Sequence, residues 1–182
     1  MFSSLLFSIS LLLQTLVSLT TDSSFYELPL PKADGTTVSA QSLQGKKVVI
    51  VTLPTQPNAN SNRFLEQLDS LARVRVTDVI IVGVPMVEGG AASQNKEALM
   101  AWYQSKLGDE VVVLEGMPSR KASKNQHPLF AWLTHQEQNG HFDEDITGTR
   151  QLFFISRDGA LYGSMEAGEE FPASAVQKML NR

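Results

Sequence analysis

The stretch KVVIVTL, residues 47–53, runs directly into PTQPNANSN, residues 54–62, and together they decide the fold. The first part is apolar at nearly every position, which is typical of a strand buried on both faces in the middle of a sheet. The second part has prolines and asparagines, which suit turns and helix caps. Phe64, Leu68 and Leu71 then recur at helical spacing. The pattern predicts a central strand, a loop and a helix N-terminus, where α/β proteins often carry reactive groups.

The composition is that of an ordinary globular protein. The chain has 182 residues, enough for one domain with a sizeable core, and is 42% hydrophobic and 19% charged. Its formal net charge is −4, and the densest basic run, residues 120–124, contains no aromatic side chain. Because phosphate contacts need a basic surface, we expect no nucleic-acid partner and interpret this run as a solvated loop.

Cysteine is absent from the whole sequence. This excludes disulfides, thiolate metal ligands and thiol catalysis. It leaves the redox compartment of the protein undetermined.

The first twenty residues carry no charged side chain, and residues 5–19 are mostly Leu, Ile, Val and Phe. This length suits the hydrophobic region of a signal peptide and is short for a membrane span. We therefore expect residues 1–20 to be a signal peptide, cleaved near Ser18-Leu19-Thr20, and the protein to be secreted or periplasmic. The alternative is an uncleaved anchor, and only then would the protein contact a membrane.

Residues 21–182 are predicted to form one α/β domain. An N-terminal β-hairpin is expected from residues 25–28 and 36–38 around Asp34-Gly35, and a second from residues 152–155 and 160–163 around Asp158-Gly159. Further buried strands are expected at residues 78–84 and 111–114. Helices are expected at residues 96–107, capped by Ser93, at 126–134 and at 173–180, with a polar loop over 135–149. Early crossovers and a late hairpin predict a mixed, thioredoxin-like sheet.

Several short stretches resemble the glutathione peroxidase family in their order and spacing. They are FY (25–26) before DG (34–35), LQGK (43–46), VVIVTL (48–53), VP (84–85) before a Gly-Gly pair, HPLF (127–130) and FFISRDG (153–159). The resemblance covers about residues 24–182. It implies a thioredoxin-like α/β fold of the glutathione-peroxidase type, with a central mixed sheet flanked by helices, an N-terminal β-hairpin and an inserted helix.

The catalytic positions of that family are all changed. The resemblance implies a peroxidatic cysteine or selenocysteine in the loop after the first core strand, where this chain has Pro57. It places the family's Gln at Val87 or Glu88, and its Trp-Asn pair at Gly148-Thr149. Peroxide reduction by this route needs a thiolate or selenolate that is oxidised and regenerated. We therefore expect the fold of the family without its chemistry, no catalytic residue and no cofactor.

The place of the lost active site could still hold a ligand. The expected lining is neutral to cationic and would suit a small polar or anionic molecule. The predicted lining residues are Pro57, Asn58, Asn60, Thr149 and Arg150.

The loop after residue 134 has the side chains for a metal site, but such a loop is more often a solvated surface. Its candidate ligands are His135, His141, Asp143, Glu144 and Asp145. Their spacing matches no standard ligand pattern, so we expect no metal. Trp102 and Tyr103 are at core spacing on a helix, and we expect them to pack rather than to bind a ligand.

Three functions follow as hypotheses. The first is a non-catalytic binding or interaction module, linked to oxidative-stress proteins, with an unknown small polar ligand or a protein partner. The second is a peroxidase of the oxidative-stress response with residual or altered activity. The third is a structural partner of an active homologue, which a large exposed apolar patch would favour.

Overall fold

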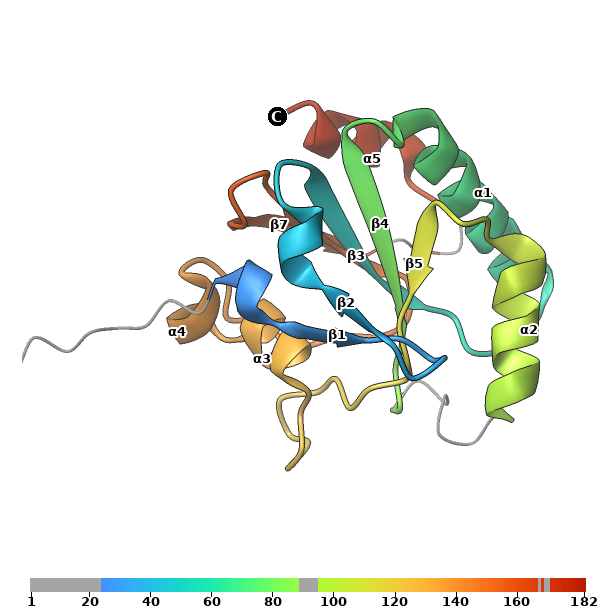
Figure 1. Ribbon diagram of the computed structural model, residues 1–182, viewed down its shortest axis with the longest axis horizontal. Helices are drawn as coiled ribbons and strands as arrows, with labels where there is room; N and C mark the ends of the chain where they lie inside the picture. The colour runs from blue at the N-terminus through green and yellow to red at the C-terminus, as the bar shows by residue number, and fades with distance from the viewer. Residues whose placement is uncertain (1–23, 89–94, 167, 169–170) are drawn as a thin grey trace, which may run out of the picture.

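The computed structural model describes residues 24–88, 95–166, 168 and 171–182 (Figure 1). Their centre is a five-stranded mixed sheet in the order β5-β4-β3-β6-β7. The strands are β3 (Lys47–Leu53), β4 (Val79–Pro85), β5 (Val111–Val113), β6 (Gln151–Ile155) and β7 (Leu161–Glu166). The predicted central strand is confirmed, because β3 pairs in parallel with β4 and antiparallel with β6.

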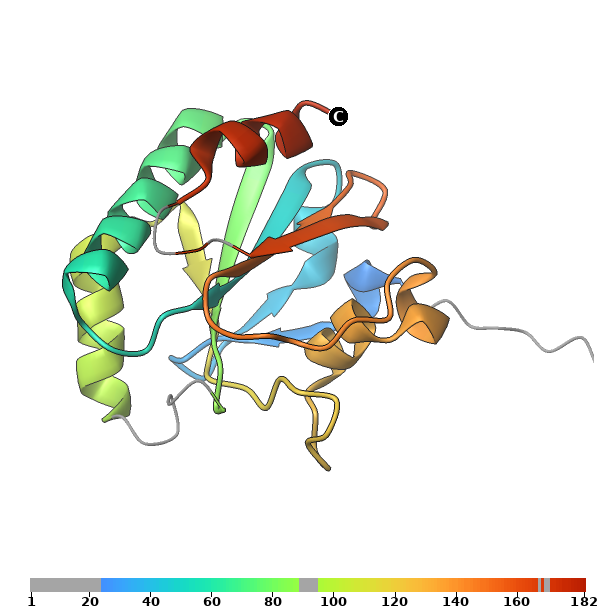
Figure 2. The ribbon, with the colours of Figure 1, turned by 180° about the vertical axis from the view of Figure 1, so that it is seen from behind.

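Helices cover one face of this sheet, and short elements cover the other (Figures 1 and 2). Helices α1 (Ala59–Arg75), α2 (Lys96–Lys106) and α5 (Ala173–Leu180) enclose one half of the core. On the opposite face lie η1 (Phe25–Glu27), the hairpin of β1 (Pro29–Pro31) and β2 (Thr37–Ser39), η2 (Ala40–Leu43), α3 (Pro128–Thr134) and α4 (Gln136–Asn139). The predicted mixed sheet with flanking helices and an N-terminal hairpin is confirmed.

The helix after β3 starts where the sequence predicts. The Asn58 side chain accepts a hydrogen bond from the Ser61 N–H at 2.8 Å and so caps α1. Phe64, Leu65 and Leu68 on one face of this helix are fully or almost fully buried. The apolar face thus fixes α1 on the sheet, with its N-terminus beside the end of β3.

The first arm of the N-terminal hairpin differs from the prediction. Residues 25–28 are not a strand: Phe25–Glu27 form a 3-10 helix, and the paired arm is Pro29–Pro31. Phe25 is fully buried, with its ring centroid 5.5 Å from that of Trp132 on α3. Burying Phe25 against α3 requires a tight turn rather than an extended chain, whereas the prolines are tolerated in a two-stranded ribbon.

Two other boundaries need correction. The helix predicted over 126–134 begins at Pro128, because the His127 ring accepts a hydrogen bond from the Leu129 N–H at 3.2 Å as its cap. The predicted loop over 135–149 contains a short helix, α4.

Some predicted features fall outside the described residues, namely Ser93 and residues 1–20. Helix α2 follows Asn95, whose side chain accepts from the Ala98 N–H at 2.9 Å. Within the part of the chain that the structure describes, no helix has both the length and the apolar character to cross a membrane.

Candidate functional site

The loop between β3 and α1 is held in place by two aromatic side chains of α2. The Tyr103 hydroxyl donates to the Pro54 carbonyl at 2.8 Å, and the Trp102 ring N–H donates to the Asn62 side-chain oxygen at 2.8 Å. Tyr103 is fully buried. The sequence predicts that this pair packs, and the structure adds that it holds the start of the loop that carries Pro57 and the first turn of α1 after it.

The segment from Gly148 to Arg150 lies beside this loop because Thr52 connects it to β3. The buried Thr52 hydroxyl donates to the Gly148 carbonyl at 2.9 Å and accepts from the Gln151 N–H at 2.8 Å. The Arg150 N–H donates to the Thr52 carbonyl at 2.5 Å. Arg150 has a φ of 68°, a left-handed conformation that is uncommon for a non-glycine residue.

The Arg150 guanidinium covers the first turn of α1. It lies 5.7 Å from the centroid of the Phe64 ring and donates to the Ser61 hydroxyl at 3.3 Å. Its Nε atom is buried without a hydrogen-bond partner. The structure therefore brings Arg150 to the start of α1, as the predicted ligand site requires. Pro57, Asn58 and Asn60 are exposed and Thr149 is half-buried, so a ligand at this place stays a prediction.

Val87 and Glu88, the candidate positions just after β4, are hydrogen-bonded to the loop over residues 117–123. The Val87 N–H donates to the Met117 carbonyl at 3.0 Å. The Glu88 carboxylate accepts from the Ser119 N–H at 2.9 Å, from the Ser119 hydroxyl at 2.9 Å and from the Ser123 hydroxyl at 2.5 Å. Partial burial raises the pKa of Glu88, but these hydrogen bonds outweigh it and lower the pKa to about 2. Glu88 is thus an ionised anchor for residues 119–123.

The chemistry available around Pro57 is limited to amides, hydroxyls and a guanidinium. The chain has no cysteine, and proline carries no nucleophilic atom. The Tyr103 hydroxyl is committed to the Pro54 carbonyl, and burial raises its pKa, so it stays a neutral phenol. The loop follows the central strand as a reactive loop would, but it presents no thiol that peroxide could oxidise and a reductant restore.

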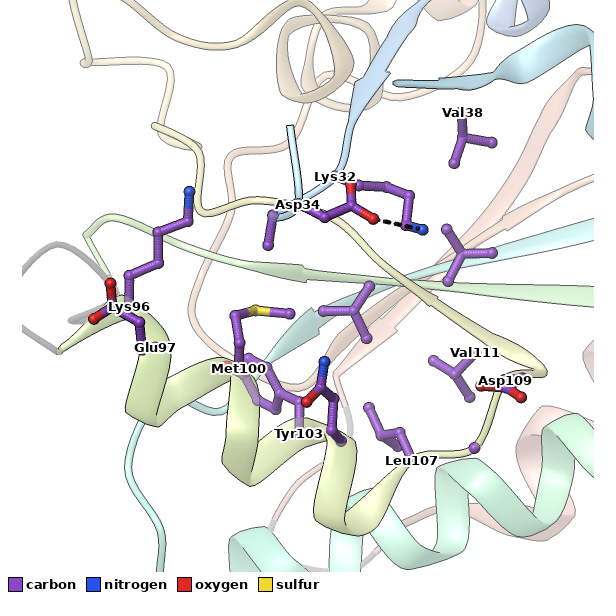
Figure 3. A pocket seen from close by; sticks show the side chains of 15 residues that line it. Lys32, Asp34, Val38, Lys96, Glu97, Met100, Tyr103, Leu107, Asp109 and Val111 are labelled. Carbon is purple, nitrogen blue, oxygen red and sulfur yellow. Dashed lines mark ion pairs between the residues drawn. The ribbon is translucent and has the colours of Figure 1, made fainter. Parts of the chain in front are cut away.

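A hollow of about 580 Å³ lies elsewhere, between α2 and the β1–β2 hairpin at the outer edge of β5 (Figure 3). Val38 and Val112 pack against the core on one face of the sheet, and Met100 and Val113 pack against the core on the other, all of them half-buried. Lys32 and Asp34 form an ion pair of 3.2 Å at its rim. The sequence analysis missed this groove, because it depends on how a hairpin and a helix far apart in sequence flank one strand.

Comparison with known proteins identifies the fold of this chain. No protein-family model and no curated protein matches the chain. Among solved structures, the apo form of Trgpx has a TM-score of 0.61 at 19% identity, covering 87% of this chain and 95% of that one. The GPX1 protein of T. cruzi has a TM-score of 0.57 at 13% identity over 87% and 94%. This chain has a thioredoxin-like fold.

A third solved structure with a thioredoxin-like fold is also similar to this chain. It is a secreted Mycobacterium tuberculosis disulfide oxidoreductase homologous to E. coli DsbE, with a TM-score of 0.53 at 15% identity over 86% of this chain and 96% of that chain. At these identities the likeness shows the fold alone. The predicted fold class is thus confirmed, while membership of the glutathione peroxidases stays a prediction.

Proposed function

We propose that this thioredoxin-like protein is a degenerate, glutathione-peroxidase-type protein that acts as a non-catalytic binding module for an extended polypeptide segment. The observation that carries the proposal is that the reactive-loop position holds the exposed Pro57, while a groove with apolar walls lies open at β5. The resemblance to peroxidases supports a link to oxidative-stress proteins, and the same resemblance makes residual peroxidase activity the alternative to be tested.

The free edge of β5 is what makes a polypeptide the fitting ligand. Among the described residues, β5 pairs within the sheet with β4 alone. The Leu114 N–H donates to the Gly83 carbonyl of β4 at 2.9 Å. Because successive N–H groups of a strand point to opposite sides, the Val113 N–H is directed to the open edge. An extended chain can hydrogen-bond to such an edge.

Just after β5, the same edge of the chain already pairs in antiparallel fashion with the end of β1. The Glu115 N–H donates to the Pro31 carbonyl of β1 at 2.9 Å, and Lys32 forms an isolated antiparallel bridge with Leu114. A bound segment would lie along Val111–Val113, next to the end of β1. Its alternate side chains would cover the half-buried apolar side chains on the two faces, and the mixed charges at the rim would impose no strong net charge on it.

The test uses an array of hexapeptides with Val, Ile or Phe at alternate positions and Thr, Ser or Lys between them. We expect the best binders to shift the NMR amide signals of Val111 and Val113. Val113→Pro removes the outward N–H at an edge, where proline is tolerated, and should weaken binding by about tenfold or more. Met100→Gln makes one wall of the groove polar and should also weaken peptide binding. This second variant tests the proposal if Val113→Pro fails to fold. Peptides that bind both variants as they bind the parent would refute a ligand site at β5.

We also propose that the protein acts outside the cytoplasm after removal of residues 1–20. The charge-free, apolar character of that segment supports this proposal. N-terminal sequencing of the protein isolated from its native host should find a mature chain that begins near Thr21. A chain that retains Met1 and fractionates with membranes would instead indicate an anchor.

A further inference from the structure

We propose that the corner between α3 and α4 holds a divalent transition-metal ion of the Zn²⁺ type, bound by His135, Glu137 and Asp143. The ligand atoms of these three side chains lie within 4.8 Å of one another. His135 and Asp143 were among the candidates from sequence, whereas Glu137 was not, and His141 and Glu144 lie outside the cluster. The corner lies at the opposite end of the molecule from α2 and the groove (Figure 1).

The neighbour Gln126 fixes which ring nitrogen of a neutral His135 carries the proton. The Gln126 side-chain amide nitrogen donates to the Ser119 carbonyl at 2.8 Å and to the Thr134 hydroxyl at 3.1 Å. A carbonyl only accepts, so the orientation of the Gln126 amide is fixed and its oxygen faces the His135 Nε2 at 3.1 Å. Nε2 must therefore carry the proton, and in the neutral imidazole Nδ1 has a free lone pair.

Carboxylates face that nitrogen. The His135 Nδ1 lies 3.3 Å from the Glu137 Oε1, and the Asp143 carboxylate completes the cluster. A proton on Nδ1 would pair with Glu137, and the Lys121 ammonium contacts Asp143 at 2.5 Å. A dication that takes the place of this proton would accept a lone pair from each of the three side chains.

The backbone of this corner is held in the required shape. The His135 N–H donates to the Ala131 carbonyl at 3.0 Å, and its own carbonyl accepts from the Gln138 N–H at 2.9 Å. The buried Asn139 donates to the Phe142 carbonyl at 2.9 Å and accepts from the Phe142 N–H at 2.7 Å, which turns the chain back toward α4. The imidazole is therefore positioned before any metal binds.

The ligand set selects the class of ion. One imidazole nitrogen and two carboxylate oxygens suit Zn²⁺ and similar ions, whereas Ca²⁺ and Mg²⁺ prefer oxygen ligands throughout. The Glu137 and Asp143 side chains are 71% and 60% exposed, so both can close onto an ion at the usual distance of about 2 Å. Water would fill the fourth position.

The test is calorimetric titration of the full, tag-free chain with ZnCl₂, with Co²⁺ absorption as a second readout. We expect one saturable site. His135→Gln should abolish it, and Glu137→Gln and Asp143→Asn should each weaken it by about tenfold or more. Two controls make the same chemical changes outside the cluster, His141→Gln and Glu144→Gln, and these should bind as the parent does.

A second pair of variants tests the competing cation. Lys121→Gln removes the ammonium group from Asp143 and should tighten Zn²⁺ binding several-fold, whereas Lys124→Gln removes the same charge nearby and should have a smaller effect. The proposal is overturned if the parent shows no saturable binding. It is equally overturned if the variants of His135, Glu137 and Asp143 bind as their controls do, since this would indicate non-specific attraction to surface carboxylates.

Discussion

Replacing Phe64 with Ala is expected to lower the free energy of unfolding by about 3–5 kcal/mol, the range for large-to-small substitutions of buried aromatic residues. Phe64 is 1% exposed, and its ring centroid lies 5.7 Å from that of Phe171. The Arg150 guanidinium lies over the same ring. The variant therefore leaves a cavity between α1 and the sheet and removes the support of the segment beside the Pro57 loop. Equilibrium urea unfolding measures the effect.

The matched control is on the same helix. Val74 is 72% exposed, so Val74→Ala should change the stability by less than about 0.5 kcal/mol. Equal losses in the two variants would show that α1 does not pack through Phe64, and the placement of the whole loop would then have to be revised.

The elements with continuous or strictly periodic apolar patterns could be predicted from sequence. β3 has no exposed face to interrupt its apolar run, and α5 has the predicted bounds, Ala173–Leu180. The short elements could not be predicted from sequence. Residues 25–28 offer too few positions to distinguish a strand from a 3-10 turn, and α4 is a polar helix of four residues with no apolar face.

The candidate site was predicted only in part, because its contacts join distant segments. The sequence placed Arg150 in a ligand pocket with Pro57, which stays a prediction, and in the structure the Arg150 guanidinium donates to the Ser61 hydroxyl of α1. Nothing in the sequence pairs Glu88 with Ser119, thirty-one residues away. The β5 groove was missed for the same reason, since it depends on the packing of elements rather than on spacing within one element. The sequence named His135 and Asp143 as candidate metal ligands but not Glu137, which the structure places beside them.

We propose that this thioredoxin-like protein performs no peroxidase cycle, and we expect no sustained turnover of peroxide. A cycle needs a group that peroxide oxidises and a thiol reductant restores. The chain has no cysteine, and the phenol nearest the Pro57 loop is buried and hydrogen-bonded. Methionine can react with peroxide, but each of the 6 methionines consumes one equivalent and is not restored by thiols.

The most direct measurement is therefore the total hydrogen peroxide consumed per chain by the purified protein, with glutathione or a thioredoxin system supplied in excess. We expect the consumption, corrected for the protein-free rate, to stop at or below 6 equivalents, one for each methionine. A consumption that continues at a constant rate beyond that limit would contradict it, and would show that a group other than a thiol carries a catalytic reaction in this fold.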